Sequence, residues 1–125
     1  AGRGRITGPE PADAGERRSL AVLHAALLTV ACLDRLGPTR HVVLDGSFTD
    51  EPLYAPLVAT LLPGVRVEVS AERAGVTAGA ALLASHETRT GPVPVELSPV
   101  VPFAGGPDLS DYAARWAAAA KGQMR

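Results

Sequence analysis

Two short apolar segments with strand character, separated by a helical pattern, most constrain how this chain can fold. They are His41–Leu44 and Val65–Val69. A strand–helix–strand order predicts a right-handed parallel crossover, and therefore an α/β domain whose parallel strands are flanked by helices. Two strands do not make a stable sheet. The sheet is therefore expected to be incomplete in this chain, with its missing strands supplied by residues before Ala1 or by a partner chain.

The two strands are expected to differ in exposure. His41–Leu44 lacks polar alternation, which is typical of a parallel strand covered on both faces. In Val65–Val69 the valines alternate with Arg66 and Glu68, which predicts one face in water and a position nearer the edge of the sheet.

Helical patterns surround the strands. Asp13 with Glu16 resembles an N-cap and its partner, leucines recur at helical spacing from Leu20 onward, and Gly37-Pro38 stops the pattern. Because this helix is apolar on more than one side, it is expected to lie buried between layers. In the second helix, Pro56 either introduces a kink or moves the start to about Ala55.

The second half of the chain predicts two more helices. One begins at Gly75, and the last runs from Leu109 to about Lys121 with Asp108 or Ser110 as its cap. The proline-rich segment 91–107 between them is expected to be an extended surface strap. The glycine- and proline-rich residues 1–15 read as a linker or a ragged N-terminal edge, residues 16–121 as the folded part, and residues 122–125 as a tail.

Composition excludes several functions. With a formal charge of −1 and 4% aromatic residues, the chain has no basic stripe for binding nucleic acid. The apolar run Leu20–Leu33 is shorter than the roughly 20 residues that span a bilayer, and no signal peptide is recognised, so no membrane partner and a cytoplasmic location are expected. Cys32 is the only cysteine in the sequence, so an internal disulfide is excluded. It is expected to act as a small hydrophobe.

Candidate chemistry is sparse. DGSFT around Ser47 is not a nucleophile elbow, and the phosphate-loop and dinucleotide fingerprints are absent. His24 has no acidic or histidine partner at helical spacing, so a role at the rim of the core is favoured over metal binding. Asp50 and Glu51 are adjacent, which favours capping of the next helix over catalysis.

Two glycines near strand-to-helix transitions are more informative. Glycine allows a ligand or a neighbouring backbone to approach closely, and Gly46 and Gly79 both stand near such transitions. Gly79 lies inside a predicted helix, where it costs roughly 1 kcal/mol relative to alanine. This pattern is compatible with a nucleotide cleft and with ordinary α/β packing.

The ordered set of segments carries a resemblance to a known family. A helix is followed by VVLDGSFTDEPLYAPLVATLLPG, then VRVEVS, then AGVTAGAALLA. This set resembles the C-terminal domain of the FGGY carbohydrate kinases, and the D-G-x-F strand end is similar to the L-fuculokinase-like branch. The likeness runs from about Gly4 to Trp116. It implies part of an RNase H-like domain, the fold shared by actin, sugar kinases and heat-shock ATPases, here the C-terminal portion of the kinase's second domain.

The resemblance implies residue roles at the start of the second helix. The family's glycine pair corresponds here to Asp45 and Gly46, or to Gly46 and Ser47 if the match shifts by one residue. The Gly46 turn would lie beside adenosine and the α-phosphate of ATP. Ser47 or Phe48 would line the adenine side. Glu51 stands near the place where the family often has an asparagine that meets the adenine amino group. The implied function is a contribution to the adenosine-side wall of a cleft in which ATP, with Mg²⁺, phosphorylates a sugar hydroxyl.

The resemblance also implies what the chain lacks. Gly79 and Ala80 would pack their helix against the sheet, a supporting role. The catalytic aspartate, the phosphate loop and most sugar contacts belong to upstream segments in this family. The chain alone is therefore expected to hold no catalytic or metal-binding residue and to be inactive, with the N-terminal kinase domain of its parent and a sugar as partners.

Two alternatives remain open. One is a kinase-like binding or regulatory module that has lost catalysis, because the charges of Asp45 and Glu51 near a phosphate would repel ATP. The other is an unrelated small α/β protein that forms a homo-oligomer to complete its sheet, which an unpaired edge at residues 65–69 would favour.

Overall fold

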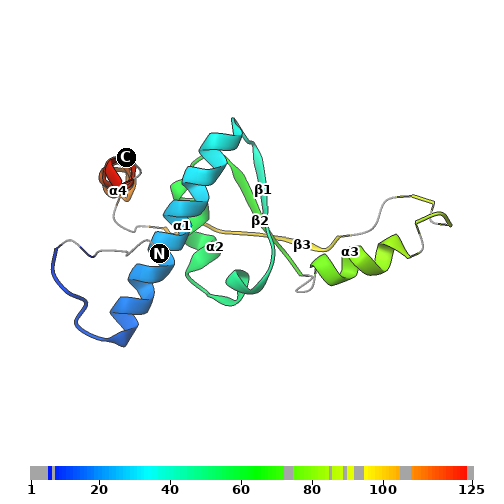
Figure 1. The fold of residues 1–125 in the computed structure, drawn as a ribbon, viewed down its shortest axis with the longest axis horizontal. Coiled ribbons are helices and arrows are strands. Elements are labelled where there is room, and N and C mark those ends of the chain that lie inside the picture. Colours follow the sequence, from blue (N-terminus) through cyan, green and yellow to red (C-terminus); the bar gives the residue numbers. More distant parts are fainter. Residues whose placement is uncertain are drawn as a thin grey trace.

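The computed structural model describes residues 6, 8–71, 75–84, 86–88, 90–91, 95–104 and 108–123. Within these residues the chain forms a mixed α/β domain (Figure 1). Its elements in chain order are α1 (Ala14–Leu36), β1 (His41–Leu44), η1 (Ser47–Asp50), α2 (Tyr54–Leu61), β2 (Arg66–Ser70), α3 (Gly75–Leu83), β3 (Leu97–Pro99) and α4 (Ser110–Gln123).

The expected parallel crossover is confirmed. β1 pairs with β2 in parallel, with Val42 opposite Val67, and α2 connects the two strands. Figure 1 shows α1 and α2 to the left of the strands, while α3 projects to the right. α1, α2 and the sheet enclose an apolar core, whose buried members are Val22, Ala26, Val42, Leu44, Tyr54, Ala55, Val58, Ala59, Leu62 and Val67.

The strap expected at 91–107 contains a third strand. β3 pairs with β2 in antiparallel orientation, with Ser98 opposite Val69. The order β1-β2-β3 makes β2 the central strand of the described sheet, so the expected position near an edge is wrong. The sequence did not predict β3 because the segment is rich in proline, which cannot donate a hydrogen bond to a neighbouring strand. Proline is tolerated on edge strands, and β3, which ends at Pro99, is such a strand.

The start of α1 follows the sequence signal. Asp13 caps the helix, and its carboxylate accepts a hydrogen bond from the Glu16 N–H at 2.8 Å. The Glu16 carboxylate in turn accepts one from the Ala12 N–H at 2.5 Å. The first bond satisfies an amide group that the helix itself leaves without a partner, and the second holds the residue before the cap against the first turn.

Burial of α1 is one-sided, which corrects the expectation of a helix between two layers. Val22 and Leu27 are buried, whereas Leu28 is 51% exposed and Leu36 is 85% exposed. Cys32 is exposed as well, so its expected role as a small buried hydrophobe is wrong.

The length of α1 also corrects an expectation. The helix has 23 residues with a mean hydropathy of 1.6 over its most apolar window, so it is long and apolar enough to cross a membrane. Core helices of soluble proteins meet the same criterion, and α1 contributes Val22 and Ala26 to the core described above.

The start of α2 shows how Pro56 is accommodated. The helix begins at Tyr54, one residue before the expected start, and Pro56 lies in its first turn. Amide groups of a first turn have no partner within the helix, so a proline there removes no helical hydrogen bond.

The last helix docks on the first. In α4, the Ser110 N–H donates to Asp108 Oδ1 at 2.8 Å, which confirms Asp108 as the cap and lowers the pKa of its carboxyl. Trp116 Nε1 donates to His24 Nδ1 at 3.1 Å, and the two rings meet edge to face. His24 is therefore an exposed residue at the rim, as expected.

The two parallel strands do not have the expected exposure. β1 is covered on one face only, since Val43 is 45% exposed while Val42 and Leu44 are buried. In β2 the expected wet position Glu68 is 3% exposed. Its carboxylate accepts hydrogen bonds from Arg66 at 2.7 Å and pairs with His41 Nε2 at 2.5 Å. Two basic neighbours thus allow a carboxylate to be buried on the strand.

Substitution of Val58 tests the assignment of the apolar core. Its side chain is fully buried, so truncation to alanine should lower the free energy of unfolding by about 2 kcal/mol. Val43→Ala, at an exposed position of β1, is the matched control and should change it by less than about 0.5 kcal/mol. Urea unfolding of both variants measures the difference, and equal effects would contradict the assigned core.

Substitution of Glu68 tests whether its ion pairs with Arg66 and His41 stabilise the fold. The Arg66 hydrogen bond, with a further contribution from His41, lowers the pKa of Glu68 below its ordinary value of 4.5. A lowered pKa in the folded state stabilises the fold above the unfolded pKa, and this contribution is lost as the pH falls through the folded value. Wild type should therefore exceed Glu68→Gln in unfolding free energy at neutral pH, and the difference should narrow below pH 4.5.

Asp108 provides the internal control for this measurement, because its lowered pKa affects wild type and variant equally. The measurement is urea unfolding at a series of pH values. A difference that stays constant down to the acid limit would show that the Glu68 charge does not stabilise the fold.

Candidate functional site

The loop Asp45–Glu51 lies where two elements of the parallel crossover converge. It follows β1, and α3 follows β2, so parallel pairing brings both to the same edge of the sheet. In open α/β sheets, ligands bind outside the carboxyl ends of the parallel strands. This edge is therefore the place to look for a site.

Gly46 makes the turn at the end of β1. Its φ is +91°, a left-handed value that glycine adopts without steric cost, and apart from its two chain neighbours no described residue has a heavy atom within 4 Å of the position a Cβ would take. The Thr49 N–H and hydroxyl both donate to the Gly46 carbonyl, at 3.0 and 2.7 Å. The turn is thus closed from behind by Thr49 and open around the glycine.

Phe48 presents an aromatic surface beside this turn. Its side chain is 59% exposed, and its ring lies 5.3 Å from that of the buried Tyr54. Tyr54 is fixed in turn by a 2.8 Å hydrogen bond between its hydroxyl and that of Thr29 on α1. The exposed ring is therefore supported from below by the core. Ser47, the first residue of η1, is exposed.

Glu51 is held by an ion pair. Arg18 on α1 donates to Glu51 Oε2 through Nε at 2.8 Å and through its terminal nitrogen at 2.6 Å. The expected capping of the next helix is not its role, since α2 has no side-chain cap. The guanidinium compensates the Glu51 charge and ties the loop to the first helix.

Asp45 contacts both the turn after β1 and the start of α3. Its Oδ1 accepts a hydrogen bond from the Gly46 N–H at 2.7 Å. Its Oδ2 lies against Gly75, the first residue of α3, so closely that a Cβ at Gly75 would clash with it. A carboxylate is favoured at the positive end of a helix. Gly75 thus allows the exposed Asp45 carboxylate to approach the helix start closely, a role that its place at a helix start did not reveal.

Gly79 and Ala80 lie away from this convergence. Both are exposed on α3, and no heavy atom lies within 4 Å of a Cβ placed on Gly79. Within the described residues they do not pack α3 against the sheet. Their supporting role in a longer protein stays a prediction.

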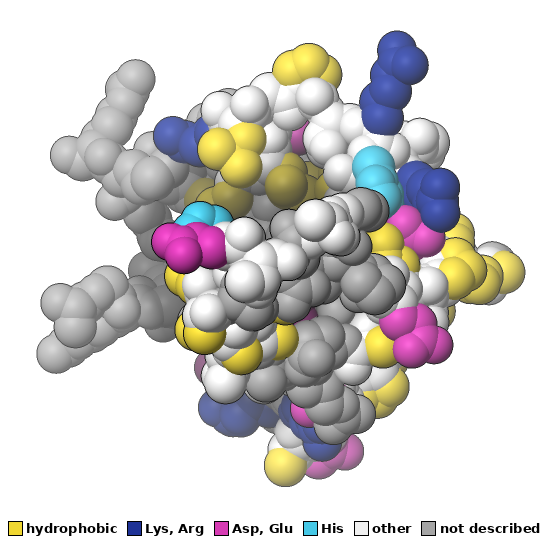
Figure 2. All heavy atoms as spheres, turned by 90° about the vertical axis from the view of Figure 1, so that its right-hand side faces the viewer, with side chains coloured by type: hydrophobic (Ala, Val, Ile, Leu, Met, Phe, Trp, Pro, Cys, Tyr) yellow, Lys and Arg dark blue, Asp and Glu magenta, His cyan; other side chains and the backbone are white. Residues whose placement is uncertain are grey.

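Charges do not form a single patch on the α3 side of the molecule. Figure 2 shows acidic and basic side chains scattered over this face, several of them close to one another. No group of three or more His, Cys, Asp or Glu side chains that could hold a metal ion occurs in the part of the chain that the structure describes.

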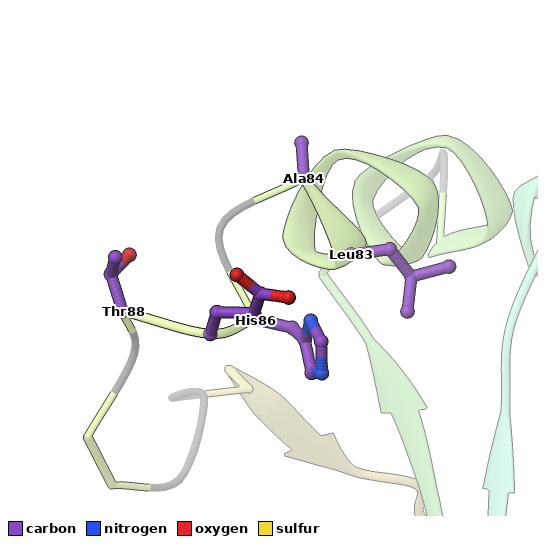
Figure 3. Close-up of a pocket in the computed structure, with 5 residues that line it drawn as sticks. Leu83, Ala84, His86 and Thr88 are labelled. Carbon is purple, nitrogen blue, oxygen red and sulfur yellow. The ribbon is translucent and has the colours of Figure 1, made fainter.

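A hollow of about 320 Å³ lies at the far end of α3, lined by Leu83, Ala84, His86, Glu87 and Thr88 (Figure 3). All of these residues come from one short segment and none is buried. The predicted site residues at 45–51 do not contribute to it. Because its lining comes from this one exposed segment, we do not regard the hollow as the site.

Comparison with solved structures gives the class of protein. The chain is similar to a carbohydrate kinase from Novosphingobium aromaticivorans, with 30% sequence identity and a TM-score of 0.67. The similarity covers 86% of this chain but 22% of that kinase. The fold is therefore part of a sugar-kinase fold, as expected from the sequence.

The family follows from a family model. The model for the C-terminal domain of the FGGY carbohydrate kinases matches residues 1–92. The chain belongs to this family and corresponds to the C-terminal domain, which implies an N-terminal domain in the full-length protein. No curated protein sequence matches the chain.

The contact between Asp45 and Gly75 predicts that the effect of Gly75→Ala on the unfolding free energy depends on the residue at position 45. Gly75→Ala should lower the unfolding free energy by no more than about 1 kcal/mol, because the new methyl group displaces only the exposed Asp45 carboxylate from the positive end of the helix. In an Asp45→Ser background the same substitution should be neutral or stabilise by up to about 1 kcal/mol, since alanine is the better helix former. Urea unfolding of the four proteins gives the coupling, and additive effects would contradict the contact.

Proposed function

We propose that the domain is the C-terminal part of an ATP-dependent carbohydrate kinase, which transfers a phosphoryl group from ATP to a sugar hydroxyl. In this proposal the loop Asp45–Glu51 contributes the adenosine-side wall of the cleft. Family membership supports the sugar-kinase part of the proposal. The role in the cleft rests on the geometry of the loop.

The observation that carries the cleft role is the exposed ring of Phe48 beside the open turn at Gly46. Bases stack on aromatic side chains through their flat faces, and the Phe48 ring is 59% exposed with Tyr54 behind it. The space at the Cβ position of Gly46 leaves room for a ribose next to the backbone. These residues fit an adenosine.

The charge of Glu51 is compatible with adenosine as a ligand, because it is paired. Arg18 pairs with Glu51, so that carboxylate does not face a nucleotide as a lone negative charge. Adenosine itself is uncharged, and the stacking surface at Phe48 is therefore not opposed by Glu51.

The chemistry of transfer is assigned to the rest of the full-length protein. The described residues hold no metal-binding cluster, so we propose that the ligands of Mg²⁺, the catalytic base and the sugar contacts come from the N-terminal domain and its connection to this one. Mg²⁺ bound with ATP would neutralise charge on the phosphates during transfer. The residues of this chain bind and orient the nucleoside end.

The D-G-x-F form at residues 45–48 supports placement in the L-fuculokinase-like branch. The residues that read the sugar hydroxyls lie outside this chain in that proposal, and a cytoplasmic enzyme of sugar metabolism is the setting that fits it.

Phe48 provides the test of the adenosine wall. In the full-length protein, Phe48→Ala should weaken adenosine binding about tenfold, because stacking of one base is worth roughly 1 to 3 kcal/mol. Phe103→Ala is the control, since Phe103 is 44% exposed and lies on the segment after β3. Isothermal titration with adenosine measures both. An unchanged affinity in Phe48→Ala would remove the loop from the site.

A second candidate is a kinase-like module that binds a partner or assembles without catalysis. The carboxylate of Asp45 favours this module, because it accepts the hydrogen bond from the Gly46 N–H that a phosphate would otherwise accept. Incubating the full-length protein with ATP, Mg²⁺ and a panel of sugars distinguishes the two. Transfer to any sugar supports the kinase, whereas adenosine binding without transfer to any of them supports the module.

A further inference from the structure

Asp45 occupies a position that the proposed ligand would need. Its Oδ1 accepts the Gly46 N–H at 2.7 Å, and its Oδ2 lies against Gly75 at the start of α3. The exposed carboxylate therefore lies between the turn after β1 and the helix after β2. These are the two backbone elements at the carboxyl edge of the parallel pair.

The same contact joins α3 to the rest of the domain. α3 projects away from the sheet in Figure 1, and its residues Gly79, Ala80 and Leu83 are exposed. Gly75 has no side chain of its own, and among the described residues the Asp45 carboxylate provides a side-chain contact at this end of the helix. A group that displaces the carboxylate also releases this contact.

We infer that Asp45 is an anionic latch, an exposed carboxylate that competes with the phosphates of the nucleotide and thereby sets how strongly the site binds ATP relative to adenosine. The inference rests on the proposed function, since it concerns the same site. A phosphate entering beside Gly46 must move the carboxylate away or accept repulsion from a like charge at short distance. Adenosine, which carries no phosphate, does not meet this competition.

This role differs from simple capping of α3. A cap stabilises the helix and would affect the binding of both ligands equally. An anionic latch affects ATP alone, because only ATP brings negative charge to the position of the carboxylate. The ratio of the two affinities therefore separates the roles.

Asp45→Asn is the matched variant. The amide keeps the side-chain shape and the oxygen that accepts the Gly46 N–H, but it loses the charge. Asp111→Asn, in the first turn of α4, is the control for the same change of charge at another helix start. Asp45→Ser provides a second variant should the amide fold poorly, and circular dichroism verifies folding of each protein.

The experiment titrates the full-length wild type and variants with adenosine and with ATP. We expect Asp45→Asn to bind ATP about tenfold more tightly with an unchanged adenosine affinity, at low salt where charge repulsion is least screened. The Asp111→Asn protein should match wild type for both ligands. A higher ionic strength should reduce the gain.

Two other outcomes overturn the inference. If adenosine binds and the ratio of affinities is the same in wild type and Asp45→Asn, then Asp45 is only a cap, while the proposed function stands. If neither ligand binds any of the folded proteins, the proposed nucleotide site fails and the latch fails with it.

Discussion

The parallel pairing of β1 with β2 is the constraint on which the rest of the domain depends. Pairing Val42 with Val67 turns the apolar sides of both strands toward α1 and α2, and Val58 then fills the space between them. The same pairing places the loop after one strand beside the helix after the other. The core and the candidate site are thus two consequences of one register, and a slip by one residue would exchange the buried and exposed faces.

Local sequence signals predicted the elements that local chemistry determines. Asp13 with Glu16 predicted the start of α1, and Asp108 that of α4, because a capping hydrogen bond spans only a few residues. The family resemblance, now confirmed by the family model and by the solved kinase, supplied the fold class that two short strands could not define.

Features that depend on distant residues were not predictable in this way. Glu68 alternates with valines as a solvent-facing residue does, and its burial becomes understandable only when His41 lies next to it on the neighbouring strand. The exposure of Cys32 requires knowing which side of α1 meets the core. In the candidate site, the loop residues could be named from the sequence. Arg18 and Gly75 could not, since each reaches the loop across a gap of more than twenty residues.

The contact between Trp116 and His24 has a spectroscopic consequence. The sequence contains one tryptophan, and its indole N–H is committed to α1. Intrinsic fluorescence excited in the indole band therefore reports on a single place, the seam between the first and last helices. Separation of α4 would expose the indole to water and shift its emission to longer wavelength, so the docking of the C-terminal helix can be followed optically without adding a label.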